Sequence, residues 1–274
     1  MTHHYDTSED DFYKGIENAS ASVTDEVAYR LMAHLGFHGL QEHFGPLDEI
    51  RVADVGCYTG GSTIRWLKTG QALYTNSVVK VLGFDLHEET VAEARQNYPD
   101  QPHLFFARKD LADPMLLIDG QPYHLMFAPF VVETIEAFDE VQRLCTQMLD
   151  ALAGNGELYF LRLHPDALTY ADVFRDYHVP TRDTWTHGDS FKIRLAGQTE
   201  YMNDHFWKPE QIARLFSDQG CHVDLIPVGW DASDAIVDLL KGFIDATQLD
   251  ADMPEWSVPL YQIIRVVKQK TSAI

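Results

Sequence analysis

Strand patterns and helix patterns alternate along this chain from about residue 50 to residue 160. Apolar runs indicate buried strands, and apolar residues at helical spacing separate most of these runs. The predicted strands are 51–56, 78–85, 103–110, 123–130 and 157–163, and the predicted helices are 62–70, 87–99 and 135–152. Parallel strands need a long crossover connection, which is usually a helix. The alternation therefore predicts an α/β protein with a doubly wound parallel sheet and helices on both faces.

The pattern is interrupted after the fifth predicted strand. Residues 164–207 are rich in aromatic residues and histidine, and the stretch is too long for an ordinary connection. A second, helical insertion is expected near 233–247. The elements predicted around these insertions are a helix at 208–220 and strands at 221–228 and 258–268. We predict a sheet domain over residues 46–268 and an N-terminal helical cap or lid over residues 1–45. The aromatic residues of the insertion at 164–207 are typical of a small-molecule pocket.

The composition argues against several functional classes. The 274 residues include 21 Lys and Arg and 42 Asp and Glu, which gives a formal net charge of −21. This field repels DNA or RNA and favours neutral or cationic small molecules, although solubility explains the charge equally well. No apolar stretch approaches the roughly 18 residues that a membrane helix needs, and the acidic N-terminus is unlike a signal peptide. We therefore predict a cytoplasmic protein without nucleic-acid or membrane partners.

The sequence VADVGCYTGGST at residues 52–63 predicts a strand, a glycine turn and the start of a helix. Glycines such as Gly56 and Gly60 let backbone N–H groups and a helix N-terminus approach a ligand closely. A dinucleotide-binding turn has a glycine where this chain has Tyr58, and the lysine of a phosphate-binding loop is missing. The turn therefore disfavours nicotinamide dinucleotides and nucleoside triphosphates. A plain strand–helix turn without a ligand stays an alternative.

Four segments, in order along the chain, resemble the motifs of class I S-adenosylmethionine-dependent methyltransferases of the small-molecule type. The glycine turn resembles the first motif, in which glycines alternate after an acid. The other three matching segments are VLGFDLHEETVAEAR, FARKDLAD and YHLMFAPFVVETI, at the second, third and fourth strands. The resemblance covers about residues 50–160. It implies a Rossmann-like sheet that binds S-adenosylmethionine at the carboxyl ends of its strands.

The resemblance also implies which residues contact this cofactor. Asp85 would hold the ribose hydroxyls, because an ionised carboxylate makes strong hydrogen bonds to a diol. Asp110 would face the adenine amino group, and Asp54 would attract the ammonium of the amino-acid end directly or through water. The implied cofactor contacts are Asp54, Gly56, Tyr58, Gly60, Asp85, Leu86, Asp110, Leu111 and Phe127. The alternatives are a helix cap for Asp85 and a turn residue for Asp110.

Two positions depart from the family pattern. Tyr58 replaces the middle glycine, so the turn must tilt this side chain away from the cofactor or stack it along the cofactor edge. His124 stands where the fourth strand usually carries an acid, so the role of that acid is not carried over to this chain.

Aromatic residues and two candidate bases are expected on the acceptor side of the site. Aromatic walls with a few polar groups are typical of small-molecule pockets, which favours Phe130, Tyr201 and Trp207 as substrate contacts. His205 and Glu133 are the candidate proton acceptors. Two alternatives stay open: the aromatic residues of the insertion attach an extra β-hairpin to the sheet, or residues such as Phe130 belong to the core.

The sequence therefore predicts methyl transfer from S-adenosylmethionine to a small-molecule acceptor by in-line displacement. The methylated atom is an oxygen, nitrogen or carbon atom, and the sequence does not select among them. A non-catalytic S-adenosylmethionine-binding protein and a nicotinamide-dependent oxidoreductase are the alternatives. The cysteines and histidines show no metal-ligand spacing, so no metal site is predicted. The oligomeric state is open, with a homodimer as one option.

Overall fold

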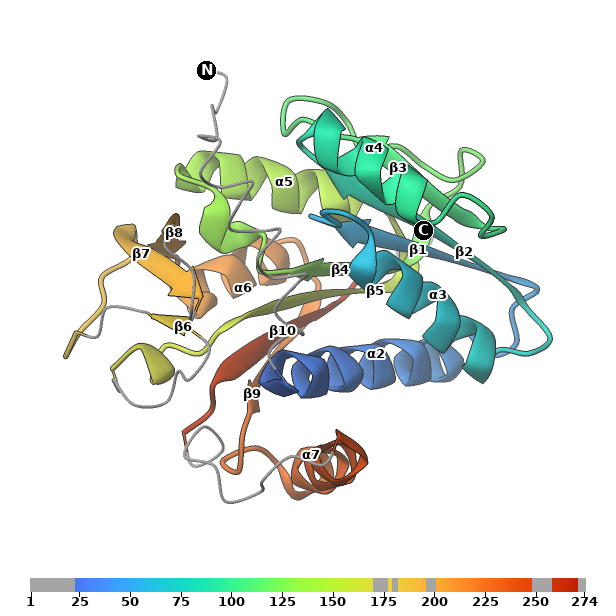
Figure 1. Cartoon of the computed structure of the whole chain (residues 1–274). Helices are drawn as coiled ribbons and strands as arrows, with labels where there is room; N and C mark the ends of the chain where they lie inside the picture. Colours follow the sequence, from blue (N-terminus) through green and yellow to red (C-terminus); the bar gives the residue numbers. More distant parts are fainter. Residues whose placement is uncertain (1–22, 170–176, 179–181, 196–200, 248–257, 271–274) are drawn as a thin grey trace.

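The computed structural model describes residues 23–169, 177–178, 182–195, 201–247 and 258–270. Its centre is a seven-stranded sheet in the order β3-β2-β1-β4-β5-β10-β9 (Figure 1). The strands are β1 (Glu49–Val55), β2 (Val78–Asp85), β3 (Leu104–Arg108), β4 (Tyr123–Pro129), β5 (Leu152–Leu163), β9 (His222–Val228) and β10 (Tyr261–Val267). Strands β1 to β5 are parallel, and β10 lies antiparallel between β5 and β9. The predicted doubly wound sheet is confirmed.

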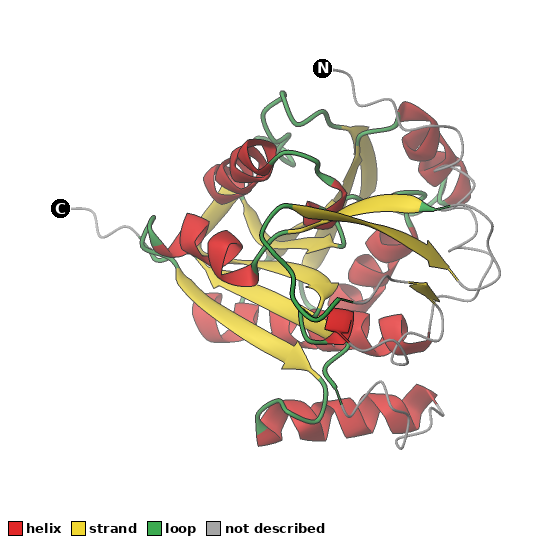
Figure 2. Cartoon of the chain, turned by 90° about the vertical axis from the view of Figure 1, so that its left-hand side faces the viewer, coloured by secondary structure: helices red, strands yellow, loops and turns green. Residues whose placement is uncertain are grey.

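Helices cover both faces of this sheet, as Figure 2 shows from the left side of Figure 1. They are α2 (Val23–Phe44), α3 (Gly61–Leu73), α4 (Glu88–Asn97), α5 (Phe138–Ala151), α6 (Pro209–Ser217) and α7 (Asp234–Thr247). Successive strand residues point to opposite faces, so Met126 and Phe127 of β4 belong to different apolar cores. Phe127 packs in the core that includes residues of α2 and α3, and Met126 packs in the core that includes residues of α5 and α6. No helix among the described residues is both long and apolar enough to cross a membrane.

The predicted N-terminal helix is present, and it lies on a face of the sheet. Helix α2 packs against β5 and α7, and its Phe37 ring lies 6.2 Å from the Phe127 ring. The residues on this side of α2 are apolar and fully buried, so they extend the core. Helix α2, which is the described part of the predicted N-terminal cap, therefore forms part of the helical layer on one face of the sheet. The remainder of that predicted cap, residues 1–22, lies outside the described residues.

The insertion after β5 forms a small sheet of its own. Strands β6 (Tyr177–His178), β7 (Asp189–Leu195) and β8 (Met202–Phe206) pair antiparallel in the order β6-β7-β8. The sequence analysis left open that the insertion forms a β-hairpin attached to the main sheet. The hairpin β7–β8 is present, but it belongs to the separate three-stranded sheet. Helix α7 confirms the helical insertion expected near 233–247.

A buried carboxylate anchors α2 to the sheet. Glu157 of β5 is fully buried and accepts hydrogen bonds from the Tyr159 hydroxyl at 2.5 Å and from Arg265 Nε at 2.8 Å. His43 Nδ1 of α2 lies 2.9 Å from Glu157 Oε1. A Cβ atom added at Gly39 would overlap this carboxylate. The helix can therefore approach the strand only because residue 39 is glycine.

We expect Gly39→Ala to lower the free energy of unfolding by about 2 kcal/mol, because the added methyl group overpacks the Glu157 site. Gly242→Ala in α7 is the matched control, since a Cβ atom there meets no atom within 4 Å. Alanine should raise helix stability at that position by ~0.5–1 kcal/mol. Urea denaturation of both variants provides the measurement, and equal stability of the two would contradict the packing assignment.

Candidate active site

The carboxyl ends of the parallel strands bring three predicted cofactor segments to one edge of the sheet. The glycine turn follows β1, Asp85 ends β2, and Asp110 lies two residues after β3. The strand register pairs Val55 with Phe84 and Asp85 with Arg108. The three segments are therefore neighbours in space as well as matches in sequence.

Backbone geometry and packing both require the glycines of the turn. The N–H groups of Gly56 and Cys57 donate to the carbonyl oxygen of Phe84 at 2.8 Å. Gly56 has a φ of 75°, and Gly60 has a φ of 93°. A Cβ atom at Gly60 would lie 2.8 Å from the Phe106 ring. The turn therefore lies tightly against the neighbouring strands.

Tyr58 adopts the left-handed backbone for which glycine is usual. Its φ is 49°, and its N–H donates to Asp85 Oδ2 at 2.9 Å. This charge-assisted hydrogen bond holds the residue in a conformation that costs free energy in any residue with a Cβ atom. It is the physical reason why the turn accepts a tyrosine. The expected position of the Tyr58 ring beside a cofactor stays a prediction.

Asp54 is fully buried, and its oxygens are occupied by side chains of α3. Asp54 Oδ2 accepts hydrogen bonds from Ser62 Oγ at 2.6 Å and Thr63 Oγ1 at 2.7 Å, and Oδ1 accepts one from Trp66 Nε1 at 2.9 Å. Burial raises the pKa of Asp54 to about 6, and these three hydrogen bonds oppose the shift. The carboxylate is thus enclosed by α3, and its direct contact with a ligand ammonium stays a prediction. Contact through water stays a prediction as well.

Asp85 connects the glycine turn to the start of α4. Besides the hydrogen bond from Tyr58, Asp85 accepts the His87 N–H at 3.1 Å and the Thr90 hydroxyl at 3.2 Å, both on Oδ1. The alternative reading of Asp85 as a helix-start residue thus agrees with its contacts. A carboxylate offers roughly four acceptor positions, so about one remains for a ligand.

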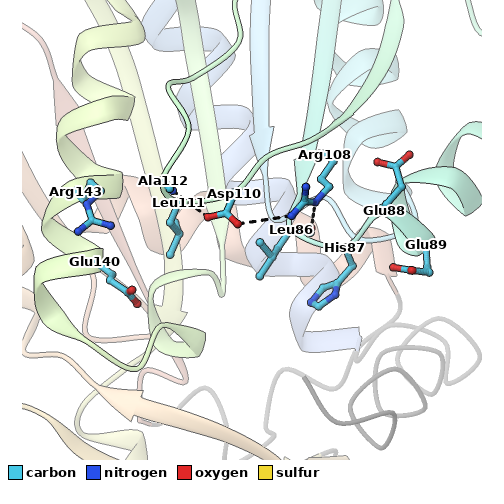
Figure 3. Close-up of a pocket in the computed structure, with 10 residues that line it drawn as sticks. All are labelled: Leu86, His87, Glu88, Glu89, Arg108, Asp110, Leu111, Ala112, Glu140 and Arg143. Carbon is cyan, nitrogen blue, oxygen red and sulfur yellow. Dashed lines mark hydrogen bonds and ion pairs between the residues drawn. The ribbon is translucent and has the colours of Figure 1, made fainter. Parts of the chain in front are cut away.

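A groove lies beside Asp85 and between β2, β3 and α5 (Figure 3). Its lining residues are Leu86, His87, Glu88, Glu89, Arg108, Asp110, Leu111, Ala112, Glu140 and Arg143. Glu140 and Arg143 stand on one side in Figure 3, and His87, Glu88 and Glu89 stand on the other. Three of the predicted cofactor contacts, Leu86, Asp110 and Leu111, share this groove. Three of its lining residues, Leu86, Leu111 and Ala112, are apolar, and most of the others are charged.

Asp110 shapes its own turn as well as lining the groove. Its Oδ1 accepts the Ala112 N–H at 3.0 Å, and its Oδ2 lies 3.6 Å from Arg108 Nη2. Arg108 Nε donates to the Leu86 carbonyl oxygen at 3.0 Å. Arg108 therefore links the turns after β2 and β3 across the groove, and the turn-residue alternative for Asp110 agrees with these contacts.

The acceptor-side candidates lie around the ends of β4 and β5. Glu133 is 3% exposed, and its Oε1 lies 3.3 Å from Nε of Arg162, which is 1% exposed. Burial raises the pKa of Glu133, and the Arg162 charge opposes that shift. Trp207 is buried and donates its indole N–H to the Ile135 carbonyl oxygen at 3.2 Å. The His205 ring stacks on Trp207 at 5.7 Å, so the short helix Val132–Thr134, β5 and β8 converge at this point.

The other predicted contacts differ in accessibility. Phe130 is half-buried with a φ of 56°, and its ring lies 5.8 Å from the Tyr261 ring. Tyr201 is exposed, with the Arg194 guanidinium 4.8 Å from its ring centroid. Phe127 is fully buried and stacks on Trp66 at 4.2 Å. The structure therefore places Phe127 in the core, where it supports the Asp54 cluster and is not exposed to a ligand.

Three solved structures share this fold over almost the whole chain. An S-adenosylmethionine-dependent methyltransferase from Clostridium acetobutylicum ATCC 824 has a TM-score of 0.59 and 12% identity, over 96% of this chain and 98% of that one. CalS10 with bound S-adenosylmethionine, an amino pentose methyltransferase from Micromonospora echinaspora, has a TM-score of 0.58 and 14% identity, over 98% and 99%. DesVI from Streptomyces venezuelae has a TM-score of 0.57 and 16% identity, over 96% and 100%.

This chain has the class I methyltransferase fold. No protein-family model matches the sequence, and no curated protein sequence matches it significantly. At these identities the likeness establishes the fold alone. The cofactor and the reaction therefore have to be argued from the residues of this chain.

Two residues that the sequence analysis did not select, Lys109 and Gln147, support the groove of this methyltransferase fold. Lys109 Nζ donates to the carbonyl oxygens of Asp110 at 3.0 Å and Asp113 at 2.6 Å, and to Gln147 Oε1 at 2.7 Å. Gln147 Nε2 of α5 donates to the Leu111 carbonyl oxygen at 3.0 Å. Burial lowers the pKa of Lys109, and Asp113 and Asp110 oppose that shift. The sequence shows Lys109 at the end of a predicted strand, but it does not show that the partner of this lysine is Gln147 on α5.

Metal ligands do not gather in this region. The described residues contain no group of three or more His, Cys, Asp or Glu side chains that could hold a metal ion. His124, the departure on the fourth strand, is buried beside Arg51, whose backbone N–H donates to His124 Nδ1 at 3.1 Å. Burial and the Arg51 charge lower the pKa of His124 to about 4. This histidine is therefore a neutral hydrogen-bonding residue of the sheet.

Asp54 should make stability depend on pH. Its carboxyl has a folded pKa of about 6 against an ordinary value of 3.8, so its stabilising contribution is complete below about pH 4 and is lost as the pH rises through 6. Asp54→Asn removes this titration. We expect the free energy of unfolding of the variant, relative to the native protein, to rise by about 2 kcal/mol from pH 4 to pH 7. Exposed Asp100→Asn is the control, and an unchanging difference for Asp54→Asn would refute the assignment.

Lys109→Met should loosen the turn after β3 without unfolding the sheet. Loss of hydrogen bonds from a charged donor, worth about 1.5–3 kcal/mol each, should speed amide hydrogen exchange at Ala112 and Asp113 at least about tenfold. Exchange in β1 and β4 should be unaffected. Lys192→Met removes an exposed lysine and is the matched control. Equal protection of the turn in both variants would show that Lys109 does not hold it.

Proposed function

We propose that this protein transfers the methyl group of S-adenosylmethionine to a small-molecule acceptor at the carboxyl edge of the sheet. The observation that carries the proposal is the joint placement of Asp85, Leu86, Asp110 and Leu111 beside the glycine turn. The class I methyltransferase fold supports it, since this edge is where open α/β sheets bind ligands.

The groove residues fit an adenosine group. Leu86 and Leu111 offer apolar surface to a flat ring, and the Asp110 carboxylate is a suitable partner for an amino group. Asp85 retains about one acceptor position for a ribose hydroxyl. We therefore assign the ribose to Asp85 and the adenine to the groove, and assign the methionine end to the turn that contains Gly56, Tyr58 and Gly60.

S-adenosylmethionine supplies a methyl group that is already electrophilic, so the protein mainly positions the acceptor, excludes water and removes a proton. We propose Glu133 and His205 as the proton acceptors. Burial makes Glu133 a stronger base than an exposed carboxylate, and Arg162 limits this effect. His205 Nδ1 is buried and finds no hydrogen-bond partner among the described residues. Both groups border the acceptor side, with Trp207 as an apolar wall.

The roof over the acceptor forms part of the proposal. Strand β8 packs against the short helix Val132–Thr134 that carries Glu133, which supports a role for the 164–207 insertion in enclosing the acceptor. Phe130, which follows β4, and Tyr201 of the insertion are proposed to contact the acceptor. Residues 1–20, the other proposed roof segment, lie outside the described part of the chain. The domain limits 1–45 and 46–268 and the cytoplasmic location stay predictions.

Asp85→Asn should weaken binding of S-adenosylhomocysteine, the demethylated product, at least tenfold. Asparagine keeps one carbonyl oxygen for the turn but loses the charge that favours a ribose hydroxyl, and tenfold corresponds to ~1.4 kcal/mol. Calorimetric titration provides the measurement. Asp100→Asn, which alters an exposed acid between α4 and β3, should bind like the native protein.

Three outcomes separate this proposal from its alternatives. Unchanged binding by a folded Asp85→Asn variant would remove Asp85 from the site. Binding without turnover on any acceptor would favour a non-catalytic S-adenosylmethionine-binding protein. Thermal stabilisation by a nicotinamide dinucleotide, and none by S-adenosylhomocysteine, would favour the oxidoreductase.

A further inference from the structure

Aromatic rings from several elements pack together at the end of β4. The Tyr29 ring of α2 lies 5.6 Å from the Trp66 ring of α3 and 6.5 Å from the Phe130 ring. The Tyr261 ring of β10 lies 5.8 Å from the Phe130 ring. Trp66 and Tyr261 are fully buried, whereas Tyr29 and Phe130 are half-buried. Tyr29 and Phe130 therefore supply the accessible surface of this aromatic cluster, and their ring planes are inclined by 61°.

Two contacts connect the aromatic cluster to the glycine turn. Trp66 donates its indole N–H to Asp54 Oδ1 at 2.9 Å, and Asp54 lies in the strand that leads into the turn. A Cβ atom added at Gly56 would lie 2.5 Å from Cγ2 of Val131, the residue after Phe130. The first residues of α2 and α3 also lie at the same edge of the sheet (Figure 1). The half-buried rings therefore stand at the end of the site to which we assign the methionine group.

An ion pair between α2 and α3 holds Tyr29 in this position. The guanidinium carbon of Arg65 lies 5.2 Å from the Tyr29 ring centroid, and Arg65 pairs with Glu26 on the preceding turn of α2. Arg30 Nε donates to the same carboxylate at 2.7 Å. Glu26 opposes the charge of Arg65, so the Tyr29 ring stays available to a second cation. The position of this ring is thus set by the protein and does not need a ligand.

We infer that Tyr29 and Phe130 contact the sulfonium group of S-adenosylmethionine and bind it by cation–π attraction. The inference rests on the proposed function and adds Tyr29, which lies outside the four motifs, to the cofactor site. A sulfonium group carries a positive charge, whereas the thioether of S-adenosylhomocysteine carries none. An aromatic face attracts a cation that lies within about 6 Å of its centroid. The aromatic cluster therefore favours the methyl donor over the demethylated product.

The surroundings of the aromatic cluster also favour a cation. The Asp85 carboxylate accepts a hydrogen bond from the turn, and the Asp54 carboxylate contacts the cluster through Trp66. Carboxylates and aromatic faces both attract a positive charge. Methyl transfer removes the charge on sulfur, so this attraction is lost when the product forms. Phe130 keeps its proposed contact with the acceptor, because the methyl group lies between sulfur and the acceptor atom during an in-line displacement.

The test is a ratio of two affinities, which calorimetric titration measures for each variant. Tyr29→Leu should weaken binding of S-adenosylmethionine about fivefold, which corresponds to ~1 kcal/mol. The affinity for S-adenosylhomocysteine should change by less than about twofold, because this ligand has no charge on sulfur. Tyr29→Phe retains the ring and should keep the native ratio. Phe44→Leu is the matched control, since it removes a half-buried ring at the other end of α2, where Phe44 packs edge-on against His124.

Each outcome decides the inference. Equal losses for both ligands in Tyr29→Leu would show that the ring only packs the site, and no loss for either would place Tyr29 outside it. A loss in Tyr29→Phe as large as in Tyr29→Leu would assign the effect to the hydroxyl group. All three results overturn the inference. If Tyr29→Leu does not fold, Phe130→Leu provides the same comparison with the same expected change in the ratio. If the native protein binds neither ligand, the proposed function falls together with the inference. If it binds both and the ratio stays constant, only the inference falls.

Discussion

The buried carboxylate of Asp54 ties the end of β1 to the start of α3, and the site depends on this connection. Ser62, Thr63 and Trp66 donate hydrogen bonds to it, which offsets part of the cost of placing a charge in the interior. The Trp66 ring also stacks on Phe127, so the same residue belongs to the core. The glycine turn lies between these two anchored ends. Its shape is therefore fixed by the interior of the protein before any ligand binds.

The sequence predicted the sheet, and the gathering of the glycine turn, Asp85 and Asp110 at one edge of it, because both follow from local patterns. Parallel strands produce apolar runs separated by helices, and a turn at a strand end has to meet the next strand end at one edge. Asp85, Asp110 and the glycine turn were placed correctly at that edge for this reason. The role of the Asp85 carboxylate in holding Tyr58 was not predictable, because it needs the φ of Tyr58 and a distance across two strands.

Contacts between distant segments account for what the sequence missed. Lys109 and Gln147 lie 38 residues apart, and Arg162 reaches the Trp207 carbonyl across 45 residues. Neither pair has a repeating spacing that a pattern could reveal. The sequence motif did not show that Phe127 faces a core. Residues of a central strand point alternately to the two faces of the sheet, and the strand register is needed to assign each residue to its face. The position of α2 on the sheet also needed its tertiary contacts, because amphipathic spacing does not say which surface a helix covers.

The antiparallel placement of β10 has a consequence for how the protein forms. This strand lies between β5 and β9, and its register joins Glu157 to Val267 and Leu163 to Tyr261. Pairing of segments about 100 residues apart is slow, because a long loop must close before the contacts form. During synthesis the half of the sheet formed by β1 to β4 emerges first. The half that contains β5 and β10 cannot assemble before residue 267 has been made, so the two halves of the sheet are completed at different times.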